Sequence, residues 1–482
     1  MNLLRRLVLL ALAITAPLGC AYTEPKVPEV ELPASFDAKS TGPSAASMKW
    51  QDSFADENLN ALITTALENN YDLRVALQRI EIARAGVRQS TGAVLPQVSL
   101  GASAGVRKFG LYTMDGAGNA TTDITPGRRV PVHYPDFVVG LQASWEIDVW
   151  GKLRSKRSAA RAQYLATIEG TNLVITTLVS EVALAYFELL ALDHRQEILA
   201  QTVARQTQSL EIMRLQKEAG RANELAVQQL EGQLASSEAM VAATLRERQE
   251  TENHINLLLG RVPQPIVRSK DLLLRDVATG ISLGIPSDLL RNRPDIREAE
   301  LQVQASKFDV QAARKAFYPS LTLSAGVGYQ AFDPRFLFVT PESLVYSAVG
   351  GLTAPLLNRS GLEAQLDVSK AMQVQAMYNY QGVILRAFVE VESALVAVER
   401  TSEVVAQKKR QKAAVSGTVD TADALFSAGK ATYLDVLLAQ QNTLSAELEL
   451  IDALLEQRFA GIGLYRALGG GLHPLTAIKP TQ

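Results

Sequence analysis

The sequence predicts an α+β membrane protein made of two internal repeats, each with a pair of strands and long coiled-coil helices. The first observation behind this is that the same order of elements can be read twice along the chain. Pro96 and Pro319 each follow a helical segment and open an alternating strand, at an offset of 223 residues. Gly220 and Gly429 lie in matching turns at an offset of 209 residues. Such a repeat favours a symmetric structural object over a single catalytic motif.

The N-terminus has the features of an export signal. Two arginines precede the apolar run Leu7–Leu18, which is too short to cross a bilayer as a helix. Cys20 follows at once and is the single cysteine of the chain. We predict that the signal peptide 1–19 is removed and that Cys20 then carries a covalent lipid, although Pro17 replaces the usual leucine of such sites. The alternative is a free thiol near an ordinary cleavage site.

The mature chain is predicted to have four parts. Residues 20–50 are rich in proline and read as a lipid-anchored extended tether. The first repeat covers 51–280 and the second 281–470, which leaves 471–482 as a C-terminal tail. Ala21, after the cysteine, is compatible with delivery to the outer membrane. No later run of eighteen or more apolar residues occurs, so no membrane-spanning helix is expected in the mature chain.

Two strand hairpins are predicted, over 96–150 and 319–357. Three strands alternate clearly between apolar and polar residues, and the fourth, near Tyr346–Ala354, is broken by Val349. Alternation alone also fits a soluble, half-buried sheet. About ten residues is the length that a tilted strand needs to cross a membrane. Four strands cannot close a barrel and lipid tolerates no open sheet edge, so several chains would have to share one barrel. The long loop 108–135 is then expected to face the cell exterior.

The helices are expected to be long coiled coils. The segments 152–218 and 361–428 keep an apolar heptad register, which predicts two uninterrupted helices, the first of roughly 100 Å. A helix over about Asp56–Thr91 runs toward the first hairpin. After the tight glycine turns, helices over 223–259 and 432–468 run back. The directions require the first helix to cover the strand-proximal half of the long one, and the returning helix to cover the distal half.

Three motifs resemble those of a known family. They are the run IPSDLLRNRPDIREAE at 285–300, its counterpart NNYDLR at 69–74, and the run WEIDVWG at 145–151. On these motifs the chain resembles the TolC-like outer-membrane efflux channels, and within them the lipoprotein branch that includes OprM and NodT. The resemblance covers nearly all of the mature chain. It implies a homotrimer with a long coiled-coil α-helical periplasmic barrel plus an outer-membrane β-barrel shared by three chains, four strands per protomer.

The resemblance also implies a function. It suggests an outer-membrane channel subunit of a tripartite efflux system that exports drugs, toxic compounds or metals, with a periplasmic adaptor protein, an inner-membrane pump and outer-membrane lipid as partners. The alternatives are a secretion conduit for a protein or oligosaccharide, and a non-transporting coiled-coil envelope scaffold. The residues show no catalytic constellation or metal-binding spacing, and the net charge of −2 does not suggest nucleic-acid binding. We therefore predict no enzyme activity and no cofactor other than the lipid on Cys20.

The candidate functional residues lie at the glycine turns. Gly220 and Gly429 mark the tips of the two coiled coils, and the resemblance implies that Leu434 and Asp435 form a pore constriction with an acidic ring. Relatives often have a second acid three positions later, where this chain has Leu438. The alternative is that Asp435 is an ordinary first-turn acid that complements the helix dipole. Four glutamates at helical spacing are interpreted as a solvated face: Glu181, Glu188, Glu390 and Glu399.

Metabolic labelling with radioactive palmitate tests the lipidation of Cys20. We expect the wild-type protein to be labelled and Cys20→Ala to remain unlabelled. Cys20→Ala should still insert partially, because one lipid anchor supplements a barrel and does not build it. An unlabelled wild-type protein would show that the thiol is not a lipid acceptor.

Overall fold

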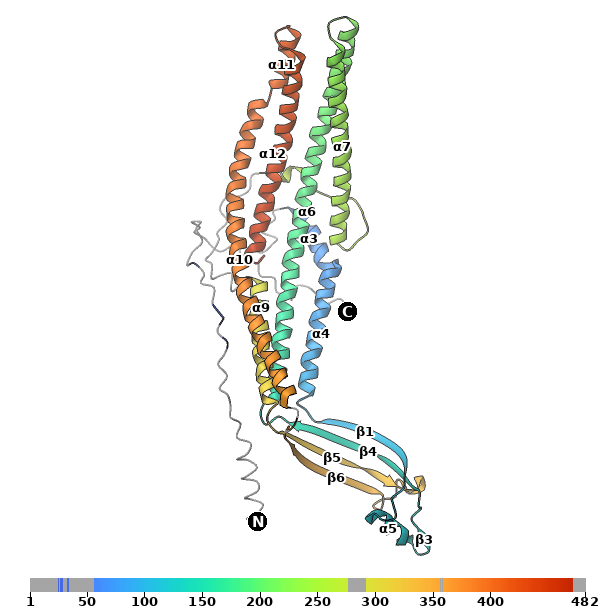
Figure 1. Ribbon diagram of the computed structural model, residues 1–482. Coiled ribbons are helices and arrows are strands. Elements are labelled where there is room, and N and C mark those ends of the chain that lie inside the picture. The colour runs from blue at the N-terminus through green and yellow to red at the C-terminus, as the bar shows by residue number, and fades with distance from the viewer. Residues whose placement is uncertain are drawn as a thin grey trace.

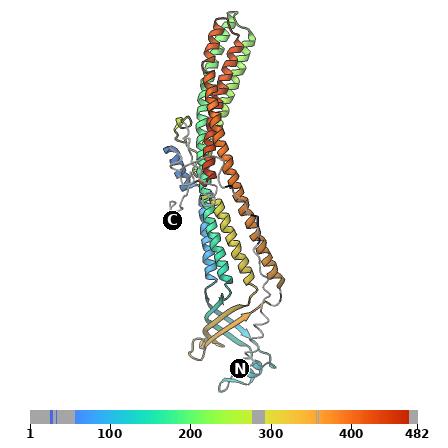
Figure 2. The ribbon, with the colours of Figure 1, turned by 90° about the vertical axis from the view of Figure 1, so that its left-hand side faces the viewer.

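The computed structural model describes residues 56–275 and 292–470, without 356 and 358, and four isolated residues before Asp56. It is an elongated molecule in which long helices continue from one end of a four-stranded sheet (Figures 1 and 2). The signal peptide, Cys20, most of the tether and the tail 471–482 lie outside the described residues.

The two halves of the chain contain the same series of elements. The first half has α3 (Glu57–Asn69), α4 (Tyr71–Gly92), β1 (Gln97–Arg107), β4 (Tyr134–Ile147), α6 (Lys152–Glu218) and α7 (Glu224–Leu258). The second half has α9 (Pro294–Lys315), β5 (Ser320–Ala331), β6 (Leu344–Thr353), α10 (Arg359–Val415), α11 (Thr418–Ser427) and α12 (Tyr433–Ala467). Short elements fill the connections: α5 (Met114–Thr121), β2 (Asp123–Thr125), β3 (Arg128–Arg129), η2 (Lys270–Leu272) and η3 (Pro334–Phe336).

The four long strands form one antiparallel sheet in the order β1-β4-β5-β6. Its register aligns apolar residues in rows across the sheet, such as Leu100, Leu141, Val327 and Tyr346. In the described part of the chain no helix packs across either face, and Leu100 is 74% and Tyr346 84% exposed (Figure 1). Val349, which breaks the alternation in the sequence, pairs with Ser324 in a polar row. One chain therefore leaves both faces and both edges of its sheet uncovered.

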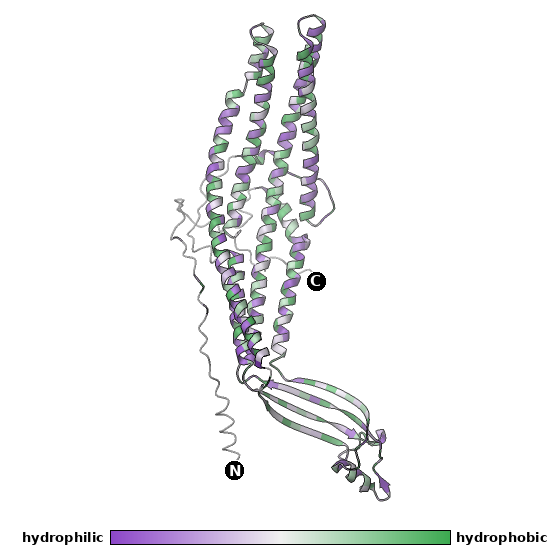
Figure 3. Ribbon diagram, in the orientation of Figure 1, coloured by the Kyte–Doolittle hydropathy of each residue, from purple (hydrophilic) through white to green (hydrophobic). Residues whose placement is uncertain are grey.

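The helices divide along α6 as their directions predict. Helices α3 and α4 pack on the part of α6 near the sheet, and α7 packs on its distal part (Figure 1). Apolar and polar residues are interspersed along these helices, as expected for coiled coils (Figure 3). One window of α6 has a mean hydropathy of 1.8 and meets the length and composition criteria for a membrane span, but 67% of it is buried. The expectation of no later apolar run of membrane-spanning length overlooked this window. Its buried residues form part of the core of the protein.

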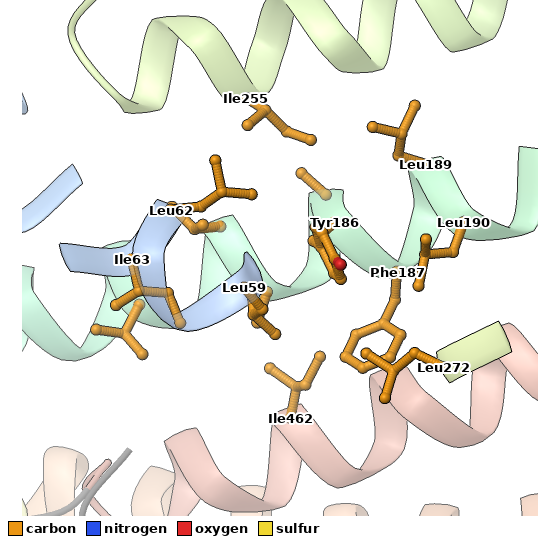
Figure 4. Packing of buried hydrophobic residues seen from close by; sticks show 14 of the residues in the cluster. Leu59, Leu62, Ile63, Tyr186, Phe187, Leu189, Leu190, Ile255, Leu272 and Ile462 are labelled. Carbon is orange, nitrogen blue, oxygen red and sulfur yellow. The ribbon is translucent and has the colours of Figure 1, made fainter. Parts of the chain in front are cut away.

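The core lies at mid-length, where helices from both halves meet. Tyr186 of α6 is fully buried there, with Leu59 and Ile63 of α3 on one side. Ile255 of α7 and Ile462 of α12 close the cluster (Figure 4). Burial of each such side chain contributes roughly 1.5–3 kcal/mol. The two halves are thus joined by one hydrophobic core.

Two expected helices are interrupted. The segment Asp56–Thr91 is two helices, because the backbone leaves the helical region at Asn70 and its side chain accepts a hydrogen bond from the N–H of Leu73. The predicted helix 361–428 is also wrong, since α10 ends at Val415 and α11 begins after Gly417, whose φ is +81°. Gly417 adopts this left-handed conformation without the strain that a Cβ would cause.

The residues that precede α4 and α9 form matching junctions in the two halves. The Asn70 side chain donates to the carbonyl of Leu258 at 3.0 Å, and the Arg293 guanidinium donates to the carbonyl of Ala467 at 2.8 Å. The two acceptors are separated by the same offset of 209 residues as the tip glycines. Arg293 is buried and also pairs with Glu390 at 2.8 Å. Glu390 is therefore more than part of a solvated face: its side chain is 41% exposed, and its carboxylate ties α10 to the start of α9.

A buried ion cluster holds the segment after α7 against α6. The Arg268 guanidinium donates to both carboxylate oxygens of Asp193, at 2.5 and 2.8 Å, and to Glu252 at 2.7 Å. The hydrogen bonds to Asp193 raise the pKa of Arg268. Only 3% of the Asp193 side chain is exposed, so loss of its charge would leave a buried cation without its main partner.

Asp193→Asn should lower the stability of the protein by about 3 kcal/mol or more, because it breaks a buried charge pair. The measurement is the melting temperature of the purified full-length protein, followed by its helical circular dichroism. The control is Glu250→Gln, which removes the exposed pair with Arg246 and should change stability by about 0.5 kcal/mol or less. Equal melting temperatures for both variants would show that the cluster does not hold this segment.

Candidate functional site

The candidate site is the helical tip at the end of the molecule opposite the sheet (Figure 1). It consists of the α6–α7 and α11–α12 turns, where Gly220 has φ +67° and Gly429 has φ +70°. At the first turn the N–H of Gly220 donates to Lys217 O, and that of Arg221 to Gln216 O. The second turn repeats both bonds 209 residues later. This pattern ends a helix on a left-handed residue, which explains why both positions are glycine.

The helices that leave the tip are capped by polar side chains. Asn223 accepts from the N–H of Ala226 at 2.9 Å at the start of α7. Helix α12 begins in a capping box, in which the Asp435 carboxylate accepts from the N–H and the hydroxyl of Thr432 at 2.8 and 2.7 Å. These hydrogen bonds lower the pKa of Asp435. The structure thus places Asp435 in the helix-capping role, with its carboxylate at the surface of the tip.

An apolar cluster joins the two coiled coils at the tip. Phe426 and Tyr433 come from the second coiled coil and meet edge to face, with ring centroids 5.6 Å apart. They pack against buried residues of the first coiled coil, including Leu210 and Leu230. Burial raises the pKa of Tyr433 well above its usual range. Tyr433 therefore lies within the protomer, whereas the neighbouring Leu434 is 55% exposed and available to another surface.

The break at Gly417 opens a hollow of about 620 Å³ beside the tip. Residues on both sides of the break line it, and Lys430 and Asp435 face it from the α11–α12 turn. The position 209 residues before Gly417 is Gln208, which lies within the continuous helix α6. Only the second coiled coil therefore has an interrupted helix close to its tip. The sequence signal was an isolated glycine between Ser416 and Thr418, which weakens the prediction of a continuous helix.

A metal site at the tip would require several ligating side chains close together. Among the described residues, no group of three or more His, Cys, Asp or Glu side chains could hold a metal ion. An exposed ion pair between Lys217 and Glu224 joins the two sides of the first turn and lowers the pKa of Glu224. The exposed residues Leu434 and Asp435 can instead act as a steric and electrostatic surface.

An open-edged sheet of membrane-crossing strands that continues into long antiparallel helices is the architecture of an outer-membrane channel subunit. The comparisons agree with this class. The chain belongs to the outer membrane efflux protein family, whose model matches residues 62–261 and 285–470. The resemblance found in the sequence is thereby confirmed.

Relatives match over nearly the whole chain. The cation efflux system protein CusC of Escherichia coli K12 is 31% identical over 473 residues, which cover 96% of this chain and 98% of CusC. The pyoverdine export outer membrane protein OpmQ of Pseudomonas putida is 31% identical over 477 residues, with 98% of each chain covered. The solved structure of the outer-membrane channel OprN superimposes with a TM-score of 0.81 at 26% identity and covers 93% of this chain and 99% of OprN. The chain is an outer-membrane protein whose helices extend into the periplasm.

Gly417→Ala tests the break in the second coiled coil. A side chain at φ +81° costs about 1–2 kcal/mol, so we expect a lower melting temperature. The matched control is Gly382→Ala in the regular part of α10, where a Cβ would meet nothing within 4 Å. The control should be stabilised by up to about 1 kcal/mol, because alanine favours the helix. A similar stabilisation of Gly417→Ala would show that residue 417 is helical in solution.

Proposed function

We propose that this chain is the channel subunit of a tripartite efflux system, and that three copies close one twelve-stranded barrel. The uncovered sheet is the observation that supports this proposal most directly. The edges β1 and β6 have no partner strand in the described chain, and lipid cannot satisfy their backbone groups. Other copies of the same sheet provide matching strands, and twelve strands exceed the practical minimum of about eight for a closed barrel.

The same assembly gives the barrel a polar lumen. With the apolar rows turned toward lipid, the polar rows face inward, and many of their residues are small. They include Gly101, Ser103, Gly105, Ser324, Gly326 and Gly328. Small side chains leave the barrel open, so the restriction of the channel belongs elsewhere.

We place the restriction at the helical tip. Three copies that converge there would bring together three Leu434 side chains as an apolar plug and three Asp435 carboxylates as a ring that favours cations. The capping role of Asp435 is compatible with this, because a carboxylate that accepts hydrogen bonds from Thr432 remains charged. A closed tip opens only if a partner binds the open form more tightly. A periplasmic adaptor protein that docks there, with its inner-membrane pump, would supply this difference.

The similarity of the two halves of the protomer also supports the proposed three-chain channel. Their matching turns, junctions and strand pairs fit an internal repeat, so that three chains would build a wall with approximate sixfold regularity. The lipid that we propose on Cys20 would anchor this assembly in addition to the barrel. CusC and OpmQ are both 31% identical to this chain, and their names refer to cations and to pyoverdine. Sequence identity therefore does not distinguish between these two cargo classes. We propose export of small toxic compounds, drugs or metals, in preference to protein or oligosaccharide secretion or a scaffold role.

Leu434→Ala combined with Asp435→Ser should open the tip. We expect a higher single-channel conductance and a weaker cation selectivity in planar bilayers, because both the plug and the charge ring are removed. Cells with this variant should take up more bulky antibiotic.

The control is Leu225→Ala at the corresponding position of the first half, which is 60% exposed at the start of α7. It should leave conductance and selectivity unchanged. If the double variant conducts and selects like the wild-type channel, the constriction is formed by other residues. Absence of any channel from the wild-type protein would instead contradict the proposed function itself.

A further inference from the structure

The charge of this chain is distributed unequally between the two ends of its sheet. The end joined to the helices consists of 84–96, 146–161, 305–319 and 354–363, which we call the collar. The collar contains eleven basic and four acidic residues, a net charge of +7 in a chain of net charge −2. The opposite end, 107–136 with 330–343, contains five of each sign. Only the periplasmic end of the membrane-crossing sheet is therefore cationic.

The collar is most basic where α6 begins, and this placement is unfavourable for the helix itself. Five basic and no acidic residues lie in Lys152–Arg161. The positive end of a helix dipole is stabilised by anions and destabilised by cations. Asp148 offsets part of this, because its carboxylate accepts from the N–H groups of Leu153 and Arg154 at 3.0 and 2.8 Å. With Asp148 and Glu146 included, the segment 146–161 still has five basic and two acidic residues.

The basic residues at the start of α6 lie on two different faces of the helix. Helices α4 and α9 both pack against α6. Lys152 pairs with Glu146 of β4 at 2.6 Å, and Glu146 belongs to a polar row of the sheet. Arg154 and Arg161 lie about two turns apart and, at 3.6 residues per turn, both lie on the side of α6 away from Lys152. Arg154 remains 58% exposed although it contacts Asp148, and exposed Arg161 has no ion pair within the described residues.

The side chains of Arg154 and Arg161 lean toward the membrane end of α6. Side chains in an α-helix lean toward its N-terminus, and the N-terminus of α6 is its membrane end. Trp150 and Tyr318 stack beside it with ring centroids 5.0 Å apart, and the Trp150 indole donates to Pro319 O at 2.7 Å. Trp150 is still 48% exposed. Exposed amphipathic aromatic residues with neighbouring basic residues are typical of a membrane–water interface.

We propose that the outer face of the collar, with Arg154 and Arg161 at its centre, binds the phosphate groups of anionic phospholipids in the periplasmic leaflet of the outer membrane. Guanidinium groups donate paired hydrogen bonds to phosphate oxygens. The collar selects anionic over zwitterionic lipid because its basic residues outnumber its acidic residues by eleven to four. The neutral opposite end of the sheet has no such preference. This inference rests on the membrane location and the charge distribution, and does not depend on the cargo or the tip.

Lipid titration of the purified full-length channel tests the proposal. The protein in neutral detergent is titrated with phosphatidylglycerol or with zwitterionic phosphatidylcholine, and retained lipid is measured by native mass spectrometry. We expect the wild-type protein to retain phosphatidylglycerol preferentially. Each basic residue near a charged membrane surface contributes a factor of about five, so Arg154→Gln with Arg161→Gln should weaken retention by about 25-fold.

Two further variants make the result specific. Arg161→Gln alone should weaken retention by about fivefold and leaves the Asp148 cap intact, which excludes a loss caused only by a disturbed start of α6. Arg128→Gln with Arg129→Gln, at the neutral end of the sheet, should retain phosphatidylglycerol like the wild-type protein. Equal retention of the two lipids by the wild-type channel would overturn the proposal. So would unchanged lipid retention in the Arg154/Arg161 variant with altered ion selectivity, because the arginines would then face the lumen.

Discussion

Backbone hydrogen bonding at the edges of the sheet is the constraint on which the rest of the structure depends. Strands β1 and β6 each present a row of N–H and C=O groups with no partner in the described chain, and the apolar rows of the sheet are exposed. Water could solvate these edges, but the hydrocarbon core of a membrane cannot. In the assembly that we propose, other copies of the chain supply the missing strands. This requirement connects the hairpins, the long helices and the membrane location in a single assembly.

The helices satisfy their own backbone hydrogen bonds, so side-chain contacts hold them together. The mid-length core around Tyr186 joins the two halves, and the buried cluster of Arg268 and Asp193 fixes the segment between them. At the junctions, Asn70 and Arg293 perform the same task with different chemistry, since each donates to the last turn of a returning helix. These contacts hold the helices of one chain together.

The tip has features that both coiled coils share and a helix break that occurs in the second coiled coil. Both glycine turns have the same hydrogen bonds, and the apolar cluster of Phe426 and Tyr433 binds the coiled coils together. Only the second coiled coil contains the break at Gly417 and the adjoining hollow. Leu434 and Asp435 lie on the side of the tip that has this interruption. The opposite end of α6 carries the basic collar that we propose to bind anionic lipid.

The sequence by itself determined the elements with a strong local signal. Alternation defined the strands, heptads defined the coiled coils, and glycines defined the tip turns, because each pattern depends on residues close together in the chain. The tertiary structure decided what depends on distant partners. Glu390 belongs to an ion pair because Arg293 reaches it across 97 residues, and Val349 fits its strand because Ser324 lies opposite. The apolar window of α6 became core because other helices surround it. The break at Gly417 also needed the structure, since a glycine in a heptad pattern permits a left-handed residue without requiring one.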